Sequence, residues 1–302
     1  MSKKLIAKIS EGLGNQLFMY ANAFSLSKKI NYNLFIDDES GYDSKSIRSF
    51  DLNNFNITAN IAANDLKFNN HKKKIIKKLL IFFDKFTKNK NFIIELRDQY
   101  KKTAYYDYIN DISLNDNIFI EGYFESEKYF LDQKKSLQKE FSLKNENIYQ
   151  DNRYINDIIN KNVVSICVRQ NRFSERLGNH SNPLSLNKSK SFVKDTIDYI
   201  KKAENLIETK ISNPIYYLWS NDFTNLREYF PENKYKFIIN NKNKILSDFY
   251  LLKNCKYFIV GPSTFHWWGA WLSDYNDKIC IRPKHLNPST NSNFWPNNWI
   301  DV

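Results

Sequence analysis

The chain has 302 residues, of which 42% are hydrophobic and 16% aromatic, so it is long enough for about two domains and too apolar to be globally disordered. Its 3 cysteines are far apart, and neither a signal-peptide core nor a run of roughly 20 apolar residues occurs, so we expect a reduced, cytoplasmic protein without disulfides or a membrane span. The net charge of +12 favours anionic partners such as nucleotide phosphates, lipid headgroups or nucleic acid.

The first predicted element is a buried strand at residues 5–9, which leads into the sequence GLGNQLFMYANAF at 12–24. Apolar residues recur there at helical spacing, so the segment is predicted to fold as strand, turn and helix. Gly12 and Gly14 let the backbone approach a bound molecule closely, and Asn15 and Gln16 add amide donors and acceptors. The third glycine of a nucleotide-binding fingerprint is absent. We therefore place Gly14 against a polar ligand; a tight turn with a polar cap is the alternative.

A second strand is predicted at 34–37 and an irregular, asparagine-rich stretch at 42–70. The sequence HKKKIIKKLLIFFDKF at 71–86 then predicts a basic amphipathic helix. Its apolar residues form one face, opposite Lys72, Lys73, Lys77, Lys78 and Lys85. Such a helix is typical of peripheral contact with an anionic membrane, here the inner face of the cell membrane. The alternative is a surface helix that packs on its own domain.

Beyond this helix, a strand is predicted at 118–120, a helix ending at 130, and a domain boundary within the charged stretch 142–152. In the second half, strands at 163–168, 215–219, 236–239 and 257–260 alternate with helices at 191–207, 248–252 and 265–272. This alternation predicts the α/β class, with parallel sheets covered by helices on both faces. We expect two Rossmann-like domains, 1–150 and 151–302, whose strands point their carboxyl ends at a ligand cleft.

Cationic and polar side chains follow the strands of the second half. Arg169, Arg172 and Arg176 come just after the strand at 163–168, where guanidinium groups are suited to grip a pyrophosphate; solvated loop arginines are the alternative. Ser263 or Thr264 is placed to cap the helix after 257–260, and the free N–H groups of such a helix start bind anions.

The strand at 215–219 is followed by Ser220, Asn221 and Asp222. An acidic residue at a strand end can accept hydrogen bonds from ribose hydroxyls or a guanine edge, so Ser220 and Asp222 are assigned to nucleotide binding. The tryptophans of the last helix are predicted to be core residues rather than ligand-stacking ones: Trp267, Trp268 and Trp271.

Several common catalytic motifs are absent from the sequence. No pair of aspartates has the DxD spacing of a metal-nucleotide site, and the histidines do not form an HExxH pattern. Neither a GxSxG elbow nor a P-loop occurs. These absences favour a metal-free group transfer from a nucleotide over hydrolysis or phosphoryl transfer.

The ordered motifs resemble those of the α-1,2-fucosyltransferase family, glycosyltransferase family 11. GLGNQLFMYANAF resembles the family's GGLGNQ-F-YA motif, and GYFESEKYF at 122–130 resembles its GY-QSEKYF segment. SICVRQNRF resembles the H-x-R-R-x-D motif, and YLWSND resembles the FSDD element. DFYLLKNCKYFIVGPSTFHWWGAWL resembles the D-YLMS-C-NSSFSWWGAWL block. Together these matches cover almost the whole chain.

The resemblance implies a GT-B fold whose C-terminal domain binds GDP-fucose and whose N-terminal domain lies on the acceptor side. It implies that Arg169 neutralises the departing β-phosphate, that Asn15 lies close to the reacting centre, and that Asp222 lies near the nucleoside. The helix start that faces the phosphate would be Ser263, Thr264 and Phe265. It further implies that the reaction inverts the anomeric carbon of the transferred sugar and needs no metal. The implied acceptor is a galactose-containing glycan, with a lipid-linked glycan as one alternative.

Five positions depart from the family pattern. Cys167 stands at the motif's histidine, Gln170 at its second arginine and Arg172 at its aspartate; Glu11 replaces a glycine and Pro262 an asparagine. The charge at the donor site is thereby redistributed, with Arg172 as an added donor-binding cation. A related GDP-deoxysugar is therefore the alternative to GDP-fucose as the donor.

The general base is assigned to Glu175, the nearest carboxylate after Arg169; a solvated loop glutamate is the alternative. Residues 172–187 are assigned to the acceptor side of the site.

We expect a fucosyltransferase of bacterial surface polysaccharide or O-antigen synthesis. A non-catalytic basic protein that binds RNA or membranes is the distant alternative. No RRM-like or helix-turn-helix signature supports nucleic acid as a partner.

Overall fold

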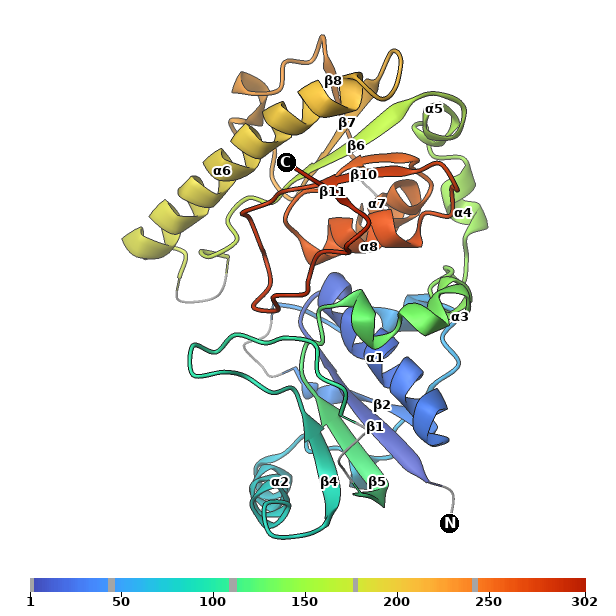
Figure 1. Cartoon of the computed structure of the whole chain (residues 1–302), viewed down its shortest axis with the longest axis vertical. Coiled ribbons are helices and arrows are strands. Elements are labelled where there is room, and N and C mark those ends of the chain that lie inside the picture. The colour runs from blue at the N-terminus through green and yellow to red at the C-terminus, as the bar shows by residue number, and fades with distance from the viewer. Residues whose placement is uncertain (1–2, 43–46, 109–112, 176–178, 241–243) are drawn as a thin grey trace. The chain divides into compact units, whose positions relative to one another are not determined.

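A computed structural model of the chain describes residues 3–42, 47–108, 113–175, 179–240 and 244–302 (Figure 1). The chain forms two compact α/β units. Unit 1 comprises Met1–Lys144 and Ser289–Pro296, and unit 2 comprises Asn145–Pro288 and Asn297–Val302. The expected division into 1–150 and 151–302 differs from these units in two ways. The first boundary lies earlier, between 144 and 145, and a segment near the C-terminus returns to unit 1.

Unit 1 contains a five-stranded sheet in the order β3-β2-β1-β5-β4, in which all neighbouring strands are parallel. Its central strand β1 is a nearly continuous buried apolar run, as is typical of a parallel strand that is covered on both faces. The elements are β1 (Lys4–Ser10), α1 (Leu13–Ile30), β2 (Asn33–Gly41), β3 (Asn60–Ile61), α2 (His71–Phe83), β4 (Asn89–Ile94), β5 (Ser113–Glu121) and α3 (Lys134–Glu140), with 3-10 turns at Leu52–Asn54, Asn64–Leu66, Glu127–Tyr129 and Leu131–Gln133.

Unit 2 contains a six-stranded parallel sheet in the order β11-β10-β9-β6-β7-β8. The long helix α6 lies across one face of it (Figure 1), where Ile197, Ile200 and Ile207 join a buried cluster with Ile166 and Leu218 of the sheet. The elements are α4 (Asn147–Gln150), α5 (Ile155–Asn160), β6 (Val163–Val168), α6 (Pro183–Glu208), β7 (Ile215–Ser220), a 3-10 turn (Leu226–Glu228), β8 (Tyr235–Phe237), α7 (Lys244–Lys253), β9 (Tyr257–Ile259), α8 (Thr264–Leu272), β10 (Ile279–Arg282) and β11 (Ile300–Asp301).

The segment 289–296 joins unit 1 through backbone and ring contacts. The Thr103 N–H donates to the Thr290 carbonyl at 3.1 Å, and the Ser292 N–H donates to the Thr103 carbonyl at 3.0 Å. Phe294 is fully buried, with its ring centroid 6.0 Å from that of Phe18 in α1. A segment distant in sequence therefore completes the core around α1.

The predicted α/β class with parallel sheets is confirmed, and so is the burial of Trp267, Trp268 and Trp271. Some local predictions were wrong. The segment expected to be a helix up to residue 130 contains a single 3-10 turn, Glu127–Tyr129, and the edge strand β4 and the strand β10 were not predicted. Within the described ranges, no helix has the length and hydrophobicity that a bilayer span needs.

Candidate functional site

The predicted donor-binding residues of unit 2 follow three adjacent strands of its sheet: β9, β6 and β7. The chain enters the sheet at β6, proceeds outward through β7 and β8, and then returns to β9 on the other side of β6. The strand order therefore reverses between β6 and β9, and open parallel sheets bind ligands beside such a reversal, at the carboxyl ends of the strands. Arg169 directly follows β6, and Ser263 begins the helix after β9.

Arg169 forms an ion pair with Glu175 inside the loop that follows β6. About a quarter of each side chain is exposed, 25% for Arg169 and 27% for Glu175. The loop is compact because the N–H groups of Glu175 and Ser174 both donate to the Asn171 carbonyl, at 2.8 and 3.1 Å. A guanidinium carries five N–H donors, so Arg169 is able to bind a carboxylate and a phosphate oxygen together.

Gln170 joins the loops after β6 and β7. Its side-chain amide donates to the carbonyls of Asp222 and Thr224, at 2.7 and 2.9 Å. Its backbone N–H donates to Oδ1 of Asn221 at 2.8 Å. The residue that replaces the family's second arginine therefore braces the loop that carries Asp222.

Asp222 and Ser220 differ in how their side chains are engaged. The Asp222 carboxylate accepts from the hydroxyl and the N–H of Thr224, at 2.7 and 2.9 Å, and these bonds hold its pKa below the ordinary value. Asp222 is thus an ionised acceptor at the strand end. The buried Ser220 hydroxyl donates to the Val168 carbonyl at 2.8 Å, which ties the end of β7 to the end of β6.

Arg172 has different partners from Arg169. Its guanidinium donates to the Pro288 carbonyl and lies near the rings of Phe173 and Phe192, 5.8 and 5.4 Å from their centroids. Arg172 therefore packs on an aromatic pair. The third arginine of the expected phosphate grip, Arg176, lies outside the described residues.

The start of α8 is held by a buried histidine that the sequence did not reveal as a functional candidate. Ser263 is the N-cap, and its Oγ accepts from the His266 N–H at 3.1 Å. Nδ1 of His266 accepts from the Gly261 N–H at 2.8 Å, so the ring proton sits on Nε2 and is donated to Ser165 Oγ at 2.7 Å. Burial lowers the pKa of His266 to about 3, so the ring is neutral. It fixes the turn that presents Ser263, Thr264 and Phe265.

Two further groups lie buried at this end of the sheet. Burial raises the pKa of the Cys167 thiol to about 12, so it stays protonated at neutral pH. Asp248 on α7 is 7% exposed and accepts from the Asn240 amide at 2.6 Å, and burial raises its pKa to about 6. Asp248 was not selected from the sequence, although it opens the DFYLLKNC block. A carboxyl with a raised pKa beside a strand-end site is a functional candidate.

In unit 1, the two amides after the glycine turn have different surroundings. Gln16 is fully buried, donates to the carbonyls of Glu11 and Ser49 at 2.8 and 2.7 Å, and accepts from the Asp51 N–H at 2.9 Å. It ties the start of α1 to residues 49–51. Asn15 is half-buried in the first turn of α1, next to the buried Gly14, at the carboxyl end of β1.

Sequence reasoning missed two charged residues near the same end of the unit 1 sheet. Arg48 lies over the glycine turn, and a Cβ added to Gly12 would be 3.7 Å from its side chain. Glu95 is 5% exposed and accepts from the Tyr123 N–H at 2.8 Å. A Cβ on Gly122 would be 2.3 Å from the Glu95 Cβ, which explains the glycine that opens GYFESEKYF.

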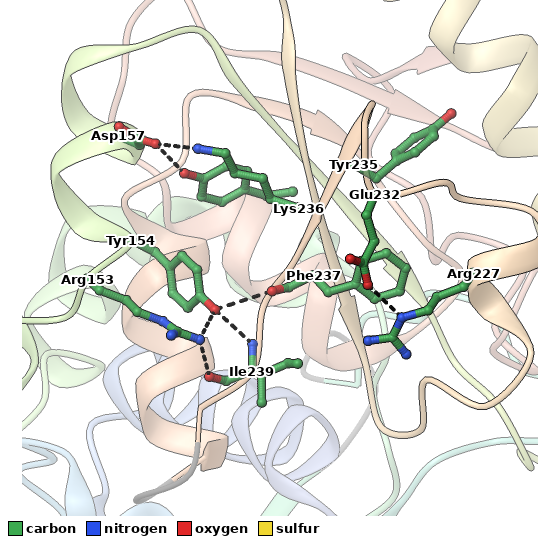
Figure 2. Close-up of a pocket in the computed structure, with 10 residues that line it drawn as sticks. Arg153, Tyr154, Asp157, Arg227, Glu232, Tyr235, Lys236, Phe237 and Ile239 are labelled. Atoms are coloured by element: carbon green, nitrogen blue, oxygen red, sulfur yellow. Dashed lines mark hydrogen bonds and ion pairs between the residues drawn. The ribbon is translucent and has the colours of Figure 1, made fainter.

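Unit 2 also has a polar cavity of about 480 Å³ at the edge strand β8 (Figure 2), and none of the predicted site residues lines it. Four of its charged side chains form ion pairs, whereas Arg153 donates to the Tyr154 hydroxyl and the Ile239 carbonyl. Asp157 accepts from Lys236 at 2.9 Å and from the Tyr217 hydroxyl at 2.7 Å, and Arg227 pairs with Glu232 at 2.6 Å. We favour the strand ends beside β6 as the ligand site, because the predicted donor-binding residues lie there and none of them lines the cavity.

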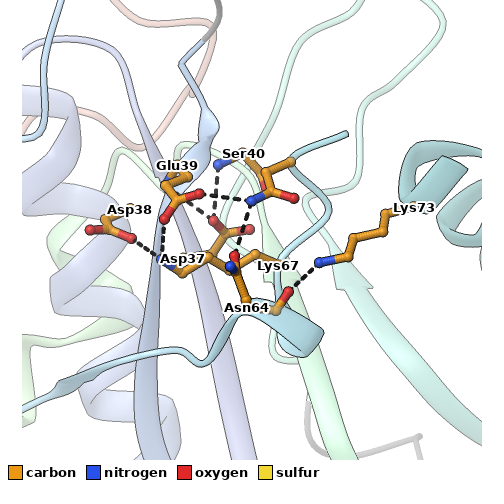
Figure 3. Close-up of polar contacts among 8 residues, drawn as sticks. Asp37, Asp38, Glu39, Ser40, Asn64, Lys67 and Lys73 are labelled. Carbon is orange, nitrogen blue, oxygen red and sulfur yellow. Dashed lines mark hydrogen bonds and ion pairs between the residues drawn. The ribbon is translucent and has the colours of Figure 1, made fainter. Parts of the chain in front are cut away.

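The acidic cluster at the end of β2 is partly neutralised from within unit 1 (Figure 3). Lys67, 5% exposed, pairs with Asp38 at 2.6 Å and with Glu39 at 2.7 Å. Asp37 accepts from the Ser40 N–H at 2.9 Å. In the part of the chain that the structure describes, no group of three or more His, Cys, Asp or Glu side chains is arranged to hold a metal.

The model of one protein family, described as Glycosyl transferase family 11, matches residues 6–302. The chain belongs to glycosyl transferase family 11. The family resemblance of the sequence motifs is thereby confirmed, and the protein is a glycosyltransferase.

Two relatives from Escherichia coli are similar over nearly their whole lengths. An alpha-1,2-colitosyltransferase is 28% identical over 299 residues, covering 92% of this chain and 91% of the relative. The O-antigen biosynthesis glycosyltransferase WbnK is 26% identical over 313 residues, covering 97% of this chain and 99% of the relative.

Among solved structures, a mutant of Arabidopsis thaliana FUT1 in complex with GDP aligns with a TM-score of 0.51 and 16% identity. The alignment covers 95% of this chain and 72% of that chain. At this identity the likeness concerns the fold, and it agrees with the predicted GT-B type.

Proposed function

We propose that this family 11 glycosyltransferase transfers a deoxysugar, L-fucose in the first instance, from its GDP-β-linked donor to a galactose hydroxyl, forming an α-1,2 linkage. The glycan would belong to a bacterial O-antigen or related surface polysaccharide. Support comes from the ordered family motifs and from the names of the two relatives, one an alpha-1,2-colitosyltransferase and the other an O-antigen biosynthesis glycosyltransferase.

The observation that carries this proposal is the position of Arg169 and of the α8 start. Arg169 follows β6 and α8 follows β9, so both lie at the strand reversal between β6 and β9. In the proposed reaction, the acceptor oxygen forms a bond to C1 of the sugar as the bond from C1 to the β-phosphate oxygen breaks. The bonding electron pair leaves with GDP, and the acceptor proton passes to a base. Arg169 and the N–H groups of Thr264 and Phe265 are proposed to stabilise the charge that develops on GDP, with Ser263 capping the helix that presents them.

The other residue roles are proposed in line with the family motifs. Asp222 would accept from the nucleoside, with Ser220 and Gln170 holding its loop, and Arg172 would add positive charge on the donor side. Asn15 and Gly14 are assigned to the side of the transferred sugar. Protein groups, rather than a metal ion, stabilise the charge on the departing GDP in this scheme. We therefore expect transfer to continue in the presence of the chelator EDTA.

A second candidate donor is a GDP-linked colitose. It is favoured by the colitosyltransferase relative and by the altered charges at Gln170 and Arg172. Both candidates share the GDP leaving group, so they call for the same Arg169 chemistry and differ only in the sugar.

A GDP-release assay with galactose-terminated acceptors tests this function. We expect turnover with GDP-fucose or GDP-colitose and none with GDP-mannose. Arg169→Ala should lower kcat by about a hundredfold or more without changing the thermal unfolding midpoint, because a preorganised charge contact is lost. Turnover of neither deoxysugar, or near-normal activity of the variant, would contradict the proposal.

Glu175→Gln separates two roles for the carboxylate that pairs with Arg169. If Glu175 is the general base, kcat falls by about a hundredfold or more while the affinity for GDP changes little. If it serves only as a counter-ion, kcat is retained and GDP binds more tightly, because Arg169 no longer has a competing anion. Calorimetric GDP titration together with the release assay distinguishes these outcomes, and the second would remove Glu175 from the mechanism.

A further inference from the structure

Helix α2 is attached to unit 1 by a mixed face whose half-buried residues are Lys73, Lys77, Leu80 and Ile81. The Lys73 ammonium group donates a hydrogen bond to the Asn64 carbonyl (Figure 3), and Lys77 forms an ion pair with Glu121 at the end of β5. At the end of the helix, the buried Asp84 carboxylate accepts from the N–H groups of Asn91 and Phe92, both at 2.8 Å. The inward side of α2 is therefore held by hydrogen bonds, an ion pair and the packing of Leu80 and Ile81.

The other apolar residues of the segment point away from the unit. No residue of the helix is buried, although a surface helix normally buries its apolar stripe. We call its exposed residues the α2 stripe; their exposed fractions run from 47% to 74%, and they are Ile75, Ile76, Leu79, Phe82, Phe83 and Phe86. The phenylalanine rings contact one another, with centroids 5.9 Å apart for Phe82 and Phe83 and 5.3 Å apart for Phe82 and Phe86.

Positive charge borders the α2 stripe. Lys74 and Lys78 on the helix and Lys85 just after it are exposed, and at 3.6 residues per turn they fall along one edge of the stripe. Lysines in this position keep their ammonium groups in water while their stems lie along an apolar surface. Exposed apolar residues beside a row of lysines match the two layers of an anionic membrane surface, the acyl region and the headgroups.

We propose that α2 docks this protein on anionic phospholipid membranes, lying in the plane of the interface with the α2 stripe in the acyl region and Lys74, Lys78 and Lys85 at the headgroups. A helix of 13 residues is about 20 Å long, too short to span a bilayer and long enough to lie along it. The docking surface lies at the β4 edge of unit 1 (Figure 1), and β5 separates β4 from β1, the strand that leads into the glycine turn.

The charge pattern favours a lipid surface over a second copy of the chain as the occupant. Two copies packed stripe to stripe would bring lysine rows together on a protein that already carries a net charge of +12. An anionic bilayer instead attracts each lysine, and the attraction weakens as salt screens it.

Vesicle flotation of the full-length protein tests this proposal. We expect binding to phosphatidylcholine vesicles that contain phosphatidylglycerol, weaker binding at high salt, and little binding to phosphatidylcholine alone. The triple charge reversal Lys74→Glu, Lys78→Glu, Lys85→Glu should lower the partition coefficient by about a hundredfold. The triple variant Phe82→Ser, Phe83→Ser, Phe86→Ser should lower it by about tenfold or more.

Matched control variants separate docking through α2 from nonspecific electrostatic or hydrophobic binding to vesicles. Lys135, Lys139 and Lys144 are exposed lysines elsewhere in unit 1, and reversing all three changes the net charge by the same amount. Ile148, Ile159 and Leu184 are exposed apolar residues of unit 2 and serve as the control for serine substitution. Binding of these control variants should match wild type.

Loss of binding in the controls equal to that in the α2 variants would overturn the proposal, as would an absence of binding to phosphatidylglycerol vesicles. A concentration-dependent dimer that the phenylalanine variant abolishes, without vesicle binding, would assign the α2 stripe to a second copy instead. Both α2 variants should retain GDP release with a soluble acceptor. The outcome of the vesicle experiment therefore does not depend on which sugar nucleotide is the donor.

Discussion

Asp248 shows how one buried carboxyl sets a pH dependence. Its pKa of about 6 in the folded protein lies above the 3.8 of an unperturbed aspartate, and the cause is burial. Between these pH values the folded state binds more protons than the unfolded state, so the contribution of this group to stability is lost as pH rises from about 4 through 6. The Asn240 amide at 2.6 Å only partly offsets the loss of hydration.

We predict that Asp248→Asn stabilises the protein above pH 6, by about 2 kcal/mol or about 5 °C in Tm, and has little effect at pH 4. The asparagine carbonyl still accepts from Asn240 but carries no charge to desolvate. Thermal unfolding of both proteins between pH 4 and pH 8 measures the difference. A Tm difference that does not change across this range would show that burial is not what perturbs this carboxyl.

Asp222→Asn serves as the control, because hydrogen bonds from Thr224 lower the pKa of Asp222. The stability from Asp222 is present above the unfolded pKa of about 4 and is lost only as pH falls below it. This variant should therefore be destabilised by a constant amount between pH 5 and pH 8, in contrast to Asp248→Asn.

At the scale of elements, the turns after β1 and β9 both contain a glycine that follows a buried strand, and they tolerate a side chain differently. A Cβ on Gly261 would lie 2.0 Å from the Cys167 carbonyl oxygen, which belongs to the backbone of β6 and cannot move aside. A Cβ on Gly12 would meet only the Arg48 side chain, at 3.7 Å, an ordinary contact distance.

We predict that Gly261→Ala lowers Tm by about 10 °C or prevents folding, because it forces β9 away from β6. Gly12→Ala should lower Tm by only about 3 °C, since Gly12 has φ −82°, which alanine adopts readily, and alanine is a slightly poorer N-cap. Differential scanning calorimetry compares the two. Equal effects would mean that the close approach at Gly261 does not constrain the sheet.

At the scale of the whole molecule, two places in unit 2 compete as the nucleotide site: the strand ends beside β6 and the cavity at β8. We predict that GDP slows amide hydrogen exchange at 169–175, 220–222 and 261–265, because these loops converge at the strand reversal. Exchange in α2 should not change, which provides an internal reference in unit 1.

Exchange measured by mass spectrometry with and without GDP decides between the two places. Protection around Arg153, Arg227 and Lys236 without protection of the three loops would move the nucleotide to the β8 cavity. Arg227→Ala would then weaken GDP binding, whereas the strand-end site predicts no effect of that variant.

The sequence predicted the elements with strong periodicity and missed those without it. The run VVSICV and the amphipathic pattern at 191–207 correspond to β6 and to the core-facing part of α6. The edge strand β4 has the sequence NKNFII, whose polar first half obscures the strand pattern. The four-residue β10 was also missed, although the shorter strands β8 and β9 were predicted. The return of residues 289–296 to unit 1 has no local signal, because it depends on contacts with residues distant in sequence, such as Phe18 and Thr103.

By itself, the sequence determined the α/β class, the order of the family motifs and the strand ends where Arg169 and Ser263 lie, because apolar periodicity and turn residues are local properties. Only the tertiary structure decided which polar side chains are already engaged. Gln16 donates to the Ser49 carbonyl and accepts from the Asp51 N–H, and Gln170 braces the loop of Asp222. It also decided that Lys73 and Lys77 of α2 face inward and the α2 stripe faces outward. Apart from Lys73 and Asn64, the partners in these contacts are far apart along the chain, so they meet only when the sheets have formed.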